Sequence, residues 1–102
     1  MDIIYSVNLN NRLECNSYVD IRPFNNSKYF VGQPYQVHFK NKHFNSIIVS
    51  ISNFYVKDLN AYMAYLYSGY NITGCTNILR KMYPHMNFNT DKFSFILFKK
   101  DK

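Results

Sequence analysis

The sequence predicts an α+β fold, in which a small antiparallel or mixed β-barrel carries two or three short helices. Three observations lead to this class. Apolar and polar residues alternate at several places, as they do along half-buried strands. In the second half of the chain the apolar spacing changes to three and four residues, which is the helical period. The length of 102 residues and the hydrophobic content of 47% fit one domain, 1–102, with its own core.

The chain is expected to begin with two strands. Residues 3–7 form the first, and one or two poor helical turns follow where Leu9 and Leu13 lie four apart. Residues 16–22 form the second, because tyrosine, valine and isoleucine favour an extended backbone. The next segment, 23–34, is a loop punctuated by proline, asparagine and glycine.

The middle of the chain is expected to form a β-hairpin. Residues 35–39 alternate around Val37, and the basic sequence KNKH then makes a turn. The second strand of the hairpin, 44–54, has apolar residues on both faces. Phe44 and Ile48 lie on one face together with two serines, and three aliphatic residues lie on the other. We assign the aliphatic set to the core: Ile47, Val49 and Ile51.

Two helices and a closing strand are expected next. The apolar face of the first helix comprises Leu59, Tyr62, Met63 and Leu66. Gly69 lies just beyond its end, where a left-handed cap residue belongs. Thr73 is the expected N-cap of the second helix, and Pro84 ends it. The apolar face of the second helix comprises Cys75, Ile78, Leu79 and Met82, and the closing strand at 92–100 adds Phe95 and Leu97 to the core.

The strand at 16–22 carries the main functional question. Side chains two apart on a strand point to the same face, so Tyr18, Asp20 and Arg22 should lie together. An acid and a base on one face form either the floor of a site or a surface ion pair. The surface pair would stabilise the fold by less than about 1 kcal/mol.

Two short motifs accompany this order of elements. The pattern x-G-[DQ]-x-x-x-V runs from Gly32 to Val37, and Tyr83 and Pro84 follow the second helix. With these motifs, nearly the whole chain resembles the ASCH family, which consists of small PUA-like barrels associated with RNA. In that family the first motif enters the second barrel strand, and the Tyr-Pro pair precedes the last strand. The resemblance implies a PUA-like barrel for this chain.

The functional signature of the ASCH family, G-x-K-x-x-E-x-R, falls on Cys15 to Arg22. Arg22 matches it, and Asp20 replaces the glutamate conservatively. Ser17 occupies the position of the lysine and Cys15 that of the glycine, so half of the signature is missing. The resemblance therefore implies a divergent member, which lacks the motif lysine and in which Asp20 and Arg22 form the floor of a cleft.

Some small members of the family resemble acetylcytidine amidohydrolases, in which a lysine activates a hydroxyl nucleophile and a glutamate comes from between the two helices. Here Ser17 stands for the lysine and Asp20 for the nucleophile, and no acidic residue occurs between Asp58 and Asp91. We therefore expect this activity to be lost, and we assign no catalytic residue. A small hydrolase or ribonuclease acting on RNA or a modified nucleoside stays open as an alternative. Its candidate acid and base groups are His38, His43 and His85.

Binding of nucleic acid, and of single-stranded RNA in particular, is the function that the sequence favours. The net charge of +6 attracts polyanions, and proteins that recognise RNA often stack an unpaired base on an aromatic side chain. The expected ligand-binding residues are Ser17, Tyr18, Asp20, Arg22 and Tyr70. The expected contacts to the nucleic-acid backbone are Lys28, Lys40 and Lys42.

A protein-interaction module on a repurposed ASCH fold is a further alternative, with a host protein as partner. Its expected mark is an exposed patch on the first helix, made of Tyr62, Tyr65 and Tyr67. The abundance of asparagine, isoleucine, lysine and tyrosine is typical of an AT-rich genome, which suggests a viral or phage accessory factor.

Neither a cofactor, a metal nor a membrane is expected as a partner. The cysteines, Cys15 and Cys75, are too few for a zinc site, and no apolar stretch approaches the length that spans a bilayer. The start of the chain lacks the pattern of a signal peptide. The expected location is the cytoplasm, or the nucleus if the source is a eukaryotic virus.

Overall fold

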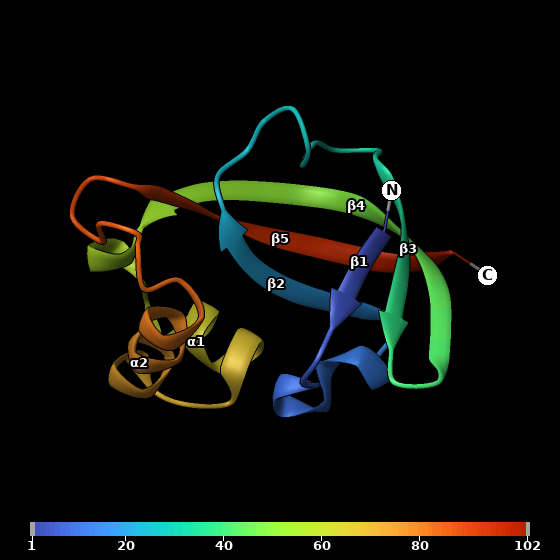
Figure 1. The fold of residues 1–102 in the computed structure, drawn as a ribbon, viewed down its shortest axis with the longest axis horizontal. Helices are drawn as coiled ribbons and strands as arrows, with labels where there is room; N and C mark the ends of the chain where they lie inside the picture. Colours follow the sequence, from blue (N-terminus) through green and yellow to red (C-terminus); the bar gives the residue numbers. More distant parts are fainter. Residues whose placement is uncertain (1, 102) are drawn as a thin grey trace.

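Five strands form one mixed sheet in the computed structural model, which describes residues 2–101 (Figure 1). The strands are β1 (Asp2–Tyr5), β2 (Ser17–Pro23), β3 (Pro34–Phe39), β4 (Lys42–Tyr55) and β5 (Lys92–Asp101). They lie side by side in the order β1-β3-β4-β5-β2. β1 pairs with β3 in parallel, and the other neighbouring pairs are antiparallel. The sheet curls into a half-barrel, which confirms the predicted α+β class and the mixed sheet.

Two α-helices and two 3₁₀ segments connect the strands. They are η1 (Leu9–Glu14), η2 (Val56–Asp58), α1 (Ala61–Ser68) and α2 (Ile72–Met82). Asn60 caps the start of α1, where its side chain accepts a hydrogen bond from the backbone N–H of Met63. Gly69 ends α1 in the left-handed region, at a φ of 78°, as predicted. Within residues 2–101, no helix is long and apolar enough to cross a membrane.

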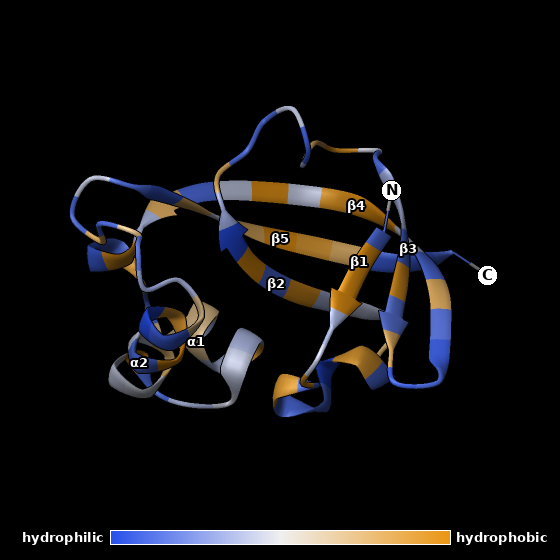
Figure 2. Ribbon diagram, in the orientation of Figure 1, coloured by the Kyte–Doolittle hydropathy of each residue, from blue (hydrophilic) through white to orange (hydrophobic). Residues whose placement is uncertain are grey.

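The sheet has one buried face along all five strands and a second buried face at β2 and β5. The core inside the half-barrel draws on all five strands, and its members include Ile3, Tyr18, Val37, Ile48 and Phe98. The other face of β2 and β5 packs against the helices, in a second core that includes Val19, Ile21, Ala64, Leu79 and Phe93. Figure 2 shows the resulting hydrophobic stretch in the middle of β5, a strand that contributes to both cores.

The half-barrel has an open seam between its two edge strands. Because β1 and β2 end the strand order, each has one edge without a neighbouring strand. Side chains bridge the seam instead of the backbone, since Tyr5 Oη donates a hydrogen bond of 2.6 Å to Asp20 Oδ2. The seam therefore places polar groups of two strands in one buried layer.

The prediction for the core face of β4 is wrong at Ile47 and Val49 and correct at Ile51. Ile47 is 37% exposed and Val49 is 45% exposed, whereas Ile48 is buried. The pairing of β4 with β5 shifts its register between Ile48 and Ser50, so Val49 forms a β-bulge. The extra residue reverses the alternation beyond it. As a result, Ile51 packs against the core inside the half-barrel, to which Ile48 also belongs.

The helix α1 also buries a different face from the predicted one. Tyr62 is 78% exposed and Leu66 is exposed as well, whereas Ala64 and Tyr67 are fully buried. Tyrosines lie on both sides of this helix, so apolar spacing alone does not distinguish its faces. Ala64 and Tyr67 both belong to the core that lies between the helices and the sheet.

The start of α2 differs from the prediction by two residues. Asn71, rather than Thr73, caps the helix, because its Oδ1 accepts a hydrogen bond of 2.9 Å from the backbone N–H of Gly74. Among the other predicted core residues, Val37, Leu59, Cys75 and Leu79 are buried, Met63, Ile78, Phe95 and Leu97 are partly buried, and Met82 is exposed.

Candidate functional site

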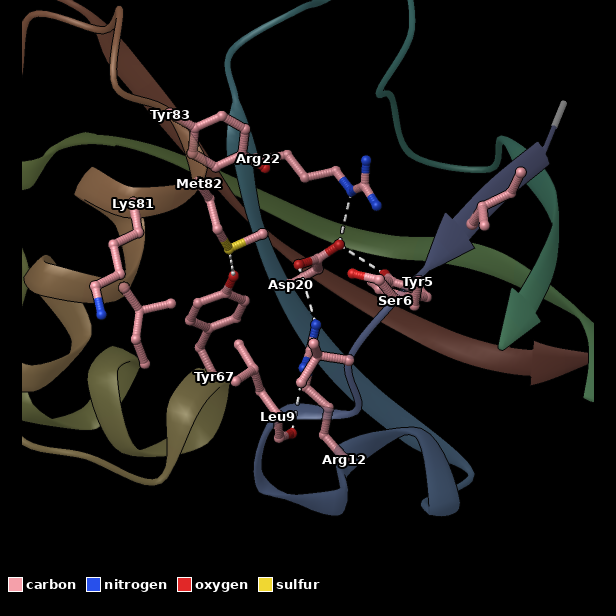
Figure 3. Close-up of a pocket in the computed structure, with 13 residues that line it drawn as sticks. Tyr5, Ser6, Leu9, Arg12, Asp20, Arg22, Tyr67, Lys81, Met82 and Tyr83 are labelled. Carbon is pink, nitrogen blue, oxygen red and sulfur yellow. Dashed lines mark hydrogen bonds and ion pairs between the residues drawn. The ribbon is translucent and has the colours of Figure 1, made fainter. Parts of the chain in front are cut away.

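A pocket of about 420 Å³ opens at the seam, between β1, β2 and the end of α2 (Figure 3). Three charged side chains at its base come from η1 and β2: Arg12, Asp20 and Arg22. Its aromatic and apolar walls include Ile4, Tyr5, Val7, Tyr67, Met82 and Tyr83. Tyr5 belongs to the core inside the half-barrel and Tyr67 to the core under the helices, so the pocket lies where the two cores meet.

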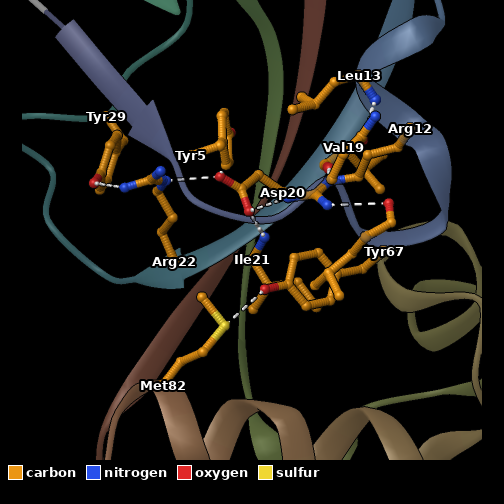
Figure 4. Close-up of polar contacts among 12 residues, drawn as sticks. Tyr5, Arg12, Leu13, Val19, Asp20, Ile21, Arg22, Tyr29, Tyr67 and Met82 are labelled. Atoms are coloured by element: carbon orange, nitrogen blue, oxygen red, sulfur yellow. Dashed lines mark hydrogen bonds and ion pairs between the residues drawn. The ribbon is translucent and has the colours of Figure 1, made fainter. Parts of the chain in front are cut away.

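Asp20 organises the base of this pocket (Figure 4). It is only 3% exposed, and both of its oxygens are occupied. Oδ2 accepts hydrogen bonds from Tyr5 Oη at 2.6 Å and from Arg22 Nε at 2.7 Å. Oδ1 accepts from the backbone N–H of Ile21 at 2.9 Å and from Arg12 Nη2 at 3.4 Å. A carboxylate has about four sites for hydrogen bonds, so Asp20 has little capacity left for a ligand.

Arg12 is buried and held rigidly. Its Nε donates to the carbonyl of Val19 at 2.8 Å, and its Nη1 donates to the carbonyl of Leu9 at 3.2 Å. Its guanidinium also lies 4.9 Å from the ring centre of Tyr67 and 5.3 Å from that of Tyr5. These contacts, with the bond to Asp20, fix η1 against β2 and close one side of the pocket.

Arg22 is the more accessible of the two arginines, with 19% of its side chain exposed. Its Nε is bound to Asp20, and its Nη1 donates a long hydrogen bond of 3.4 Å to Tyr29 Oη. A guanidinium has five N–H donors, so its two Nη groups keep donors beyond these contacts with the described residues. Burial, the largest single influence, lowers the pKa of Arg22, but the Asp20 carboxylate together with Tyr5 and Tyr29 outweighs burial, so the pKa is raised.

The electrostatics of the pocket favour ligands that accept hydrogen bonds. Two guanidinium groups and one carboxylate leave one net positive charge at its base, and Lys81 adds a cation to its lining. Burial, and then the Asp20 carboxylate, raise the pKa of Tyr5 well above its usual value of 10.0. The same two causes raise the pKa of Tyr67. Both phenols therefore stay protonated at neutral pH and are unsuited to act as general bases.

The structure brings together only part of the predicted ligand-binding set. Asp20 and Arg22 line the pocket, whereas Ser17 and Tyr70 are exposed outside it. Tyr18 shares the face of Asp20, as predicted, but it is buried in the inner core. There it stacks on Phe98 at 5.2 Å between ring centres, and burial raises its pKa to about 12. Tyr18 is therefore unavailable as a surface on which a base could stack.

Two of the three predicted backbone contacts lie next to the pocket. Lys40 and Lys42 line a second hollow, of about 620 Å³, at the turn between β3 and β4. Ser6 and Val7 line both this hollow and the pocket, so the two depressions are neighbours across that short segment. Lys28 lies elsewhere, in the loop before β3, with its Nζ 5.4 Å from the ring centre of Tyr29.

Sequence reasoning missed Arg12, Tyr5 and Tyr67 as site residues. Arg12 lies in a segment without periodicity, where an arginine is normally read as solvent-exposed. Tyr5 and Tyr67 belong to elements that were predicted, but the seam that joins them depends on how the sheet curls. No local signal in the sequence identifies these three residues as partners of Asp20.

Comparison with known proteins gives no independent assignment of this site. The chain matches no protein-family model, and searches of curated proteins and of solved structures found no match. Within residues 2–101, no group of three or more His, Cys, Asp or Glu side chains is placed to hold a metal ion.

Proposed function

We propose that this chain is a divergent ASCH-like domain with a PUA-like barrel, and that it binds single-stranded RNA without chemical turnover. One observation carries the proposal. Arg22, whose Nε is bound to the buried Asp20, lines a pocket with aromatic and apolar walls and keeps N–H donors beyond its contacts with the described residues. An unpaired base has a flat apolar face and a polar edge, and this combination suits such a pocket.

The strand on either side of that base needs a path for its phosphates. The hollow beside the pocket supplies two lysines, Lys40 and Lys42, of which Lys42 has one weak partner in Glu14 at 3.8 Å. A base in the pocket and a phosphate in the hollow would lie on opposite sides of Ser6 and Val7, which line both depressions. The net charge of +6 also favours the binding of a polyanion such as RNA.

The ASCH assignment rests on the two motifs, on Arg22 and on the half-barrel shape of the sheet. The departures from the family argue against its hydrolase chemistry. Ser17, at the lysine position, lies outside the pocket, and Asp20, at the position of the hydroxyl nucleophile, is fully engaged as an acceptor. We therefore favour binding over catalysis.

Titration of fluorescently labelled single-stranded RNA at two salt concentrations tests this function. Wild-type protein should bind at low salt, and the logarithm of its affinity should fall with the logarithm of the salt concentration by about 0.7 per phosphate contact. The double variant Lys40→Ala/Lys42→Ala should bind more weakly and with a smaller salt slope. Lys57→Ala removes an exposed lysine that lines neither depression and serves as the matched control. Absence of binding by the wild type at low salt would refute the proposal.

A role as a protein-interaction module is the second candidate, because α1 presents exposed aromatic residues. Tyr62 and Tyr65 are exposed together with Leu66, whereas Tyr67, the third residue of the predicted patch, is fully buried. Contiguous exposed apolar surface often marks a binding site for another protein. Replacement of Tyr62 and Tyr65 should leave RNA binding unchanged if the pocket is the functional site.

A further inference from the structure

We infer that the pocket selects guanine over the other bases. This inference rests on the proposed function, because it specifies which base of a bound RNA strand enters the pocket. The basis is the set of hydrogen-bond donors and acceptors at the base of the pocket that are not already paired within the protein.

The charged acceptor at the base of the pocket, Asp20, is already used. Asp20 receives four hydrogen bonds from the protein, two of them from guanidinium groups. Tyr5 donates its hydroxyl hydrogen to Asp20 and Tyr67 donates its own to the sulfur of Met82 at 3.4 Å, so these two phenol oxygens can act only as neutral acceptors. No carboxylate other than Asp20 lines the pocket within the described part of the chain. A base that must donate to a charged acceptor therefore finds none free.

The donors, in contrast, are in excess. Arg22 uses its Nε on Asp20, and its one other hydrogen bond to the described residues is the long one from Nη1 to Tyr29. Its guanidinium is held between two rings, 5.4 Å from the centre of Tyr5 and 5.9 Å from that of Tyr29. A planar fork that is fixed before binding loses little freedom when it pairs with a ligand. The pocket thus presents a preorganised pair of donors that carries a positive charge.

Guanine is the base whose edge fits this fork. Its O6 and N7 are adjacent acceptors, and an arginine commonly binds both at once. Adenine pairs its N7 with an amino donor, and cytosine presents an amino donor on the corresponding edge. On that edge both bases would direct an N–H group at a guanidinium, and the excess positive charge strengthens that repulsion. Uracil offers a carbonyl acceptor but lacks the second adjacent acceptor on that edge.

The test compares uridine pentamers that differ at the central position only. Affinities are measured by fluorescence anisotropy for central guanosine, adenosine, cytidine, inosine and 7-deazaguanosine. Guanosine and inosine, which share O6 and N7, should bind alike and about ten-fold or more above adenosine, since a good bidentate pair discriminates by about that factor. The 7-deazaguanosine pentamer, which lacks the N7 acceptor, should lose most of this advantage. This comparison uses wild-type protein alone, so it does not depend on how a variant folds.

Arg22→Lys gives a second arm, because lysine keeps the charge and lacks the planar fork. The variant should still bind the pentamers while the preference for guanosine disappears. If every pentamer binds the wild type equally, the guanine inference is wrong while the proposed RNA binding stands. If no pentamer binds at low salt, the proposed function itself fails. If 7-deazaguanosine binds as tightly as guanosine, the bidentate contact is refuted.

Discussion

Replacement of Asp20 by asparagine removes the negative charge of this carboxylate from the base of the pocket and keeps the shape of the side chain. The carboxylate accepts from both Arg12 and Arg22, and Arg12 is only 5% exposed. The amide of asparagine would also point donor hydrogens at groups that are themselves donors. Removal of one member of a buried ion pair costs about 3–5 kcal/mol, because an uncompensated charge stays inside.

The structure places the effect near the lower end of this range. Once the carboxylate no longer holds it, the partly exposed Arg22 can turn towards water, whereas Arg12 is tied to Val19 and Leu9 and cannot. We therefore expect Asp20→Asn to lower the free energy of unfolding by about 3 kcal/mol. The free energy of unfolding of a domain of this size is about 5–15 kcal/mol, so the variant should fold but unfold much more readily than the wild type.

Urea unfolding followed by circular dichroism measures this loss through the transition midpoint. With a slope of about 1–3 kcal/mol per molar, the midpoint should fall by about 1–3 M. Asp101→Asn, which changes an exposed carboxylate on β5, is the matched control and should stay within about 0.5 kcal/mol. Tyr5→Phe should lie between the two, because it removes one hydrogen bond to a charged group, worth about 1.5–3 kcal/mol. A loss below about 1 kcal/mol for Asp20→Asn would mean that water already screens the pair, and the reasoning would fail.

Two further predictions concern the sheet and the tyrosines. Ile48→Ala should lower the free energy of unfolding by about 2–5 kcal/mol, because Ile48 is buried. Val49→Ala, at the exposed bulge, should lower it by less than about 1 kcal/mol. Urea midpoints that reverse this order would contradict the bulge. Burial raises the pKa of both Tyr18 and Tyr35 to about 12, so the fold favours their neutral forms. This contribution to stability is complete below about pH 10, the range in which unfolded tyrosines ionise, and is lost as the pH rises towards 12. Urea midpoints measured across this range should decline, and a constant midpoint would refute the burial of these phenols.

The fold could be predicted where local periodicity decides the structure. Val37 is buried because β3 alternates without interruption, and Gly69 ends α1 because its backbone adopts a positive φ. Prediction failed where the periodicity is broken or ambiguous. The bulge at Val49 reverses the faces of β4, and nothing in the spacing of the isoleucines reveals it.

The candidate site could be predicted only in its strand component. The two-residue period of β2 places Asp20 and Arg22 on one face, and that part is confirmed. The same period places Tyr18 there too, but the curl of the sheet carries it into the core. Arg12 reaches Asp20 through an irregular segment, where no period applies and tertiary contacts decide the position of the side chain.

An NMR titration with single-stranded RNA tests the central claim most directly, because it reports both binding and location. Amide resonances and the Arg Nε–H resonances are followed as a guanosine-containing pentamer is added to the wild-type protein at low salt. We predict the largest changes at Arg22 Nε and at the pocket residues Ile4, Met82 and Tyr83, with smaller changes at Lys40 and Lys42. Changes confined to Tyr62 and Tyr65 on α1, or none at all, would contradict the account.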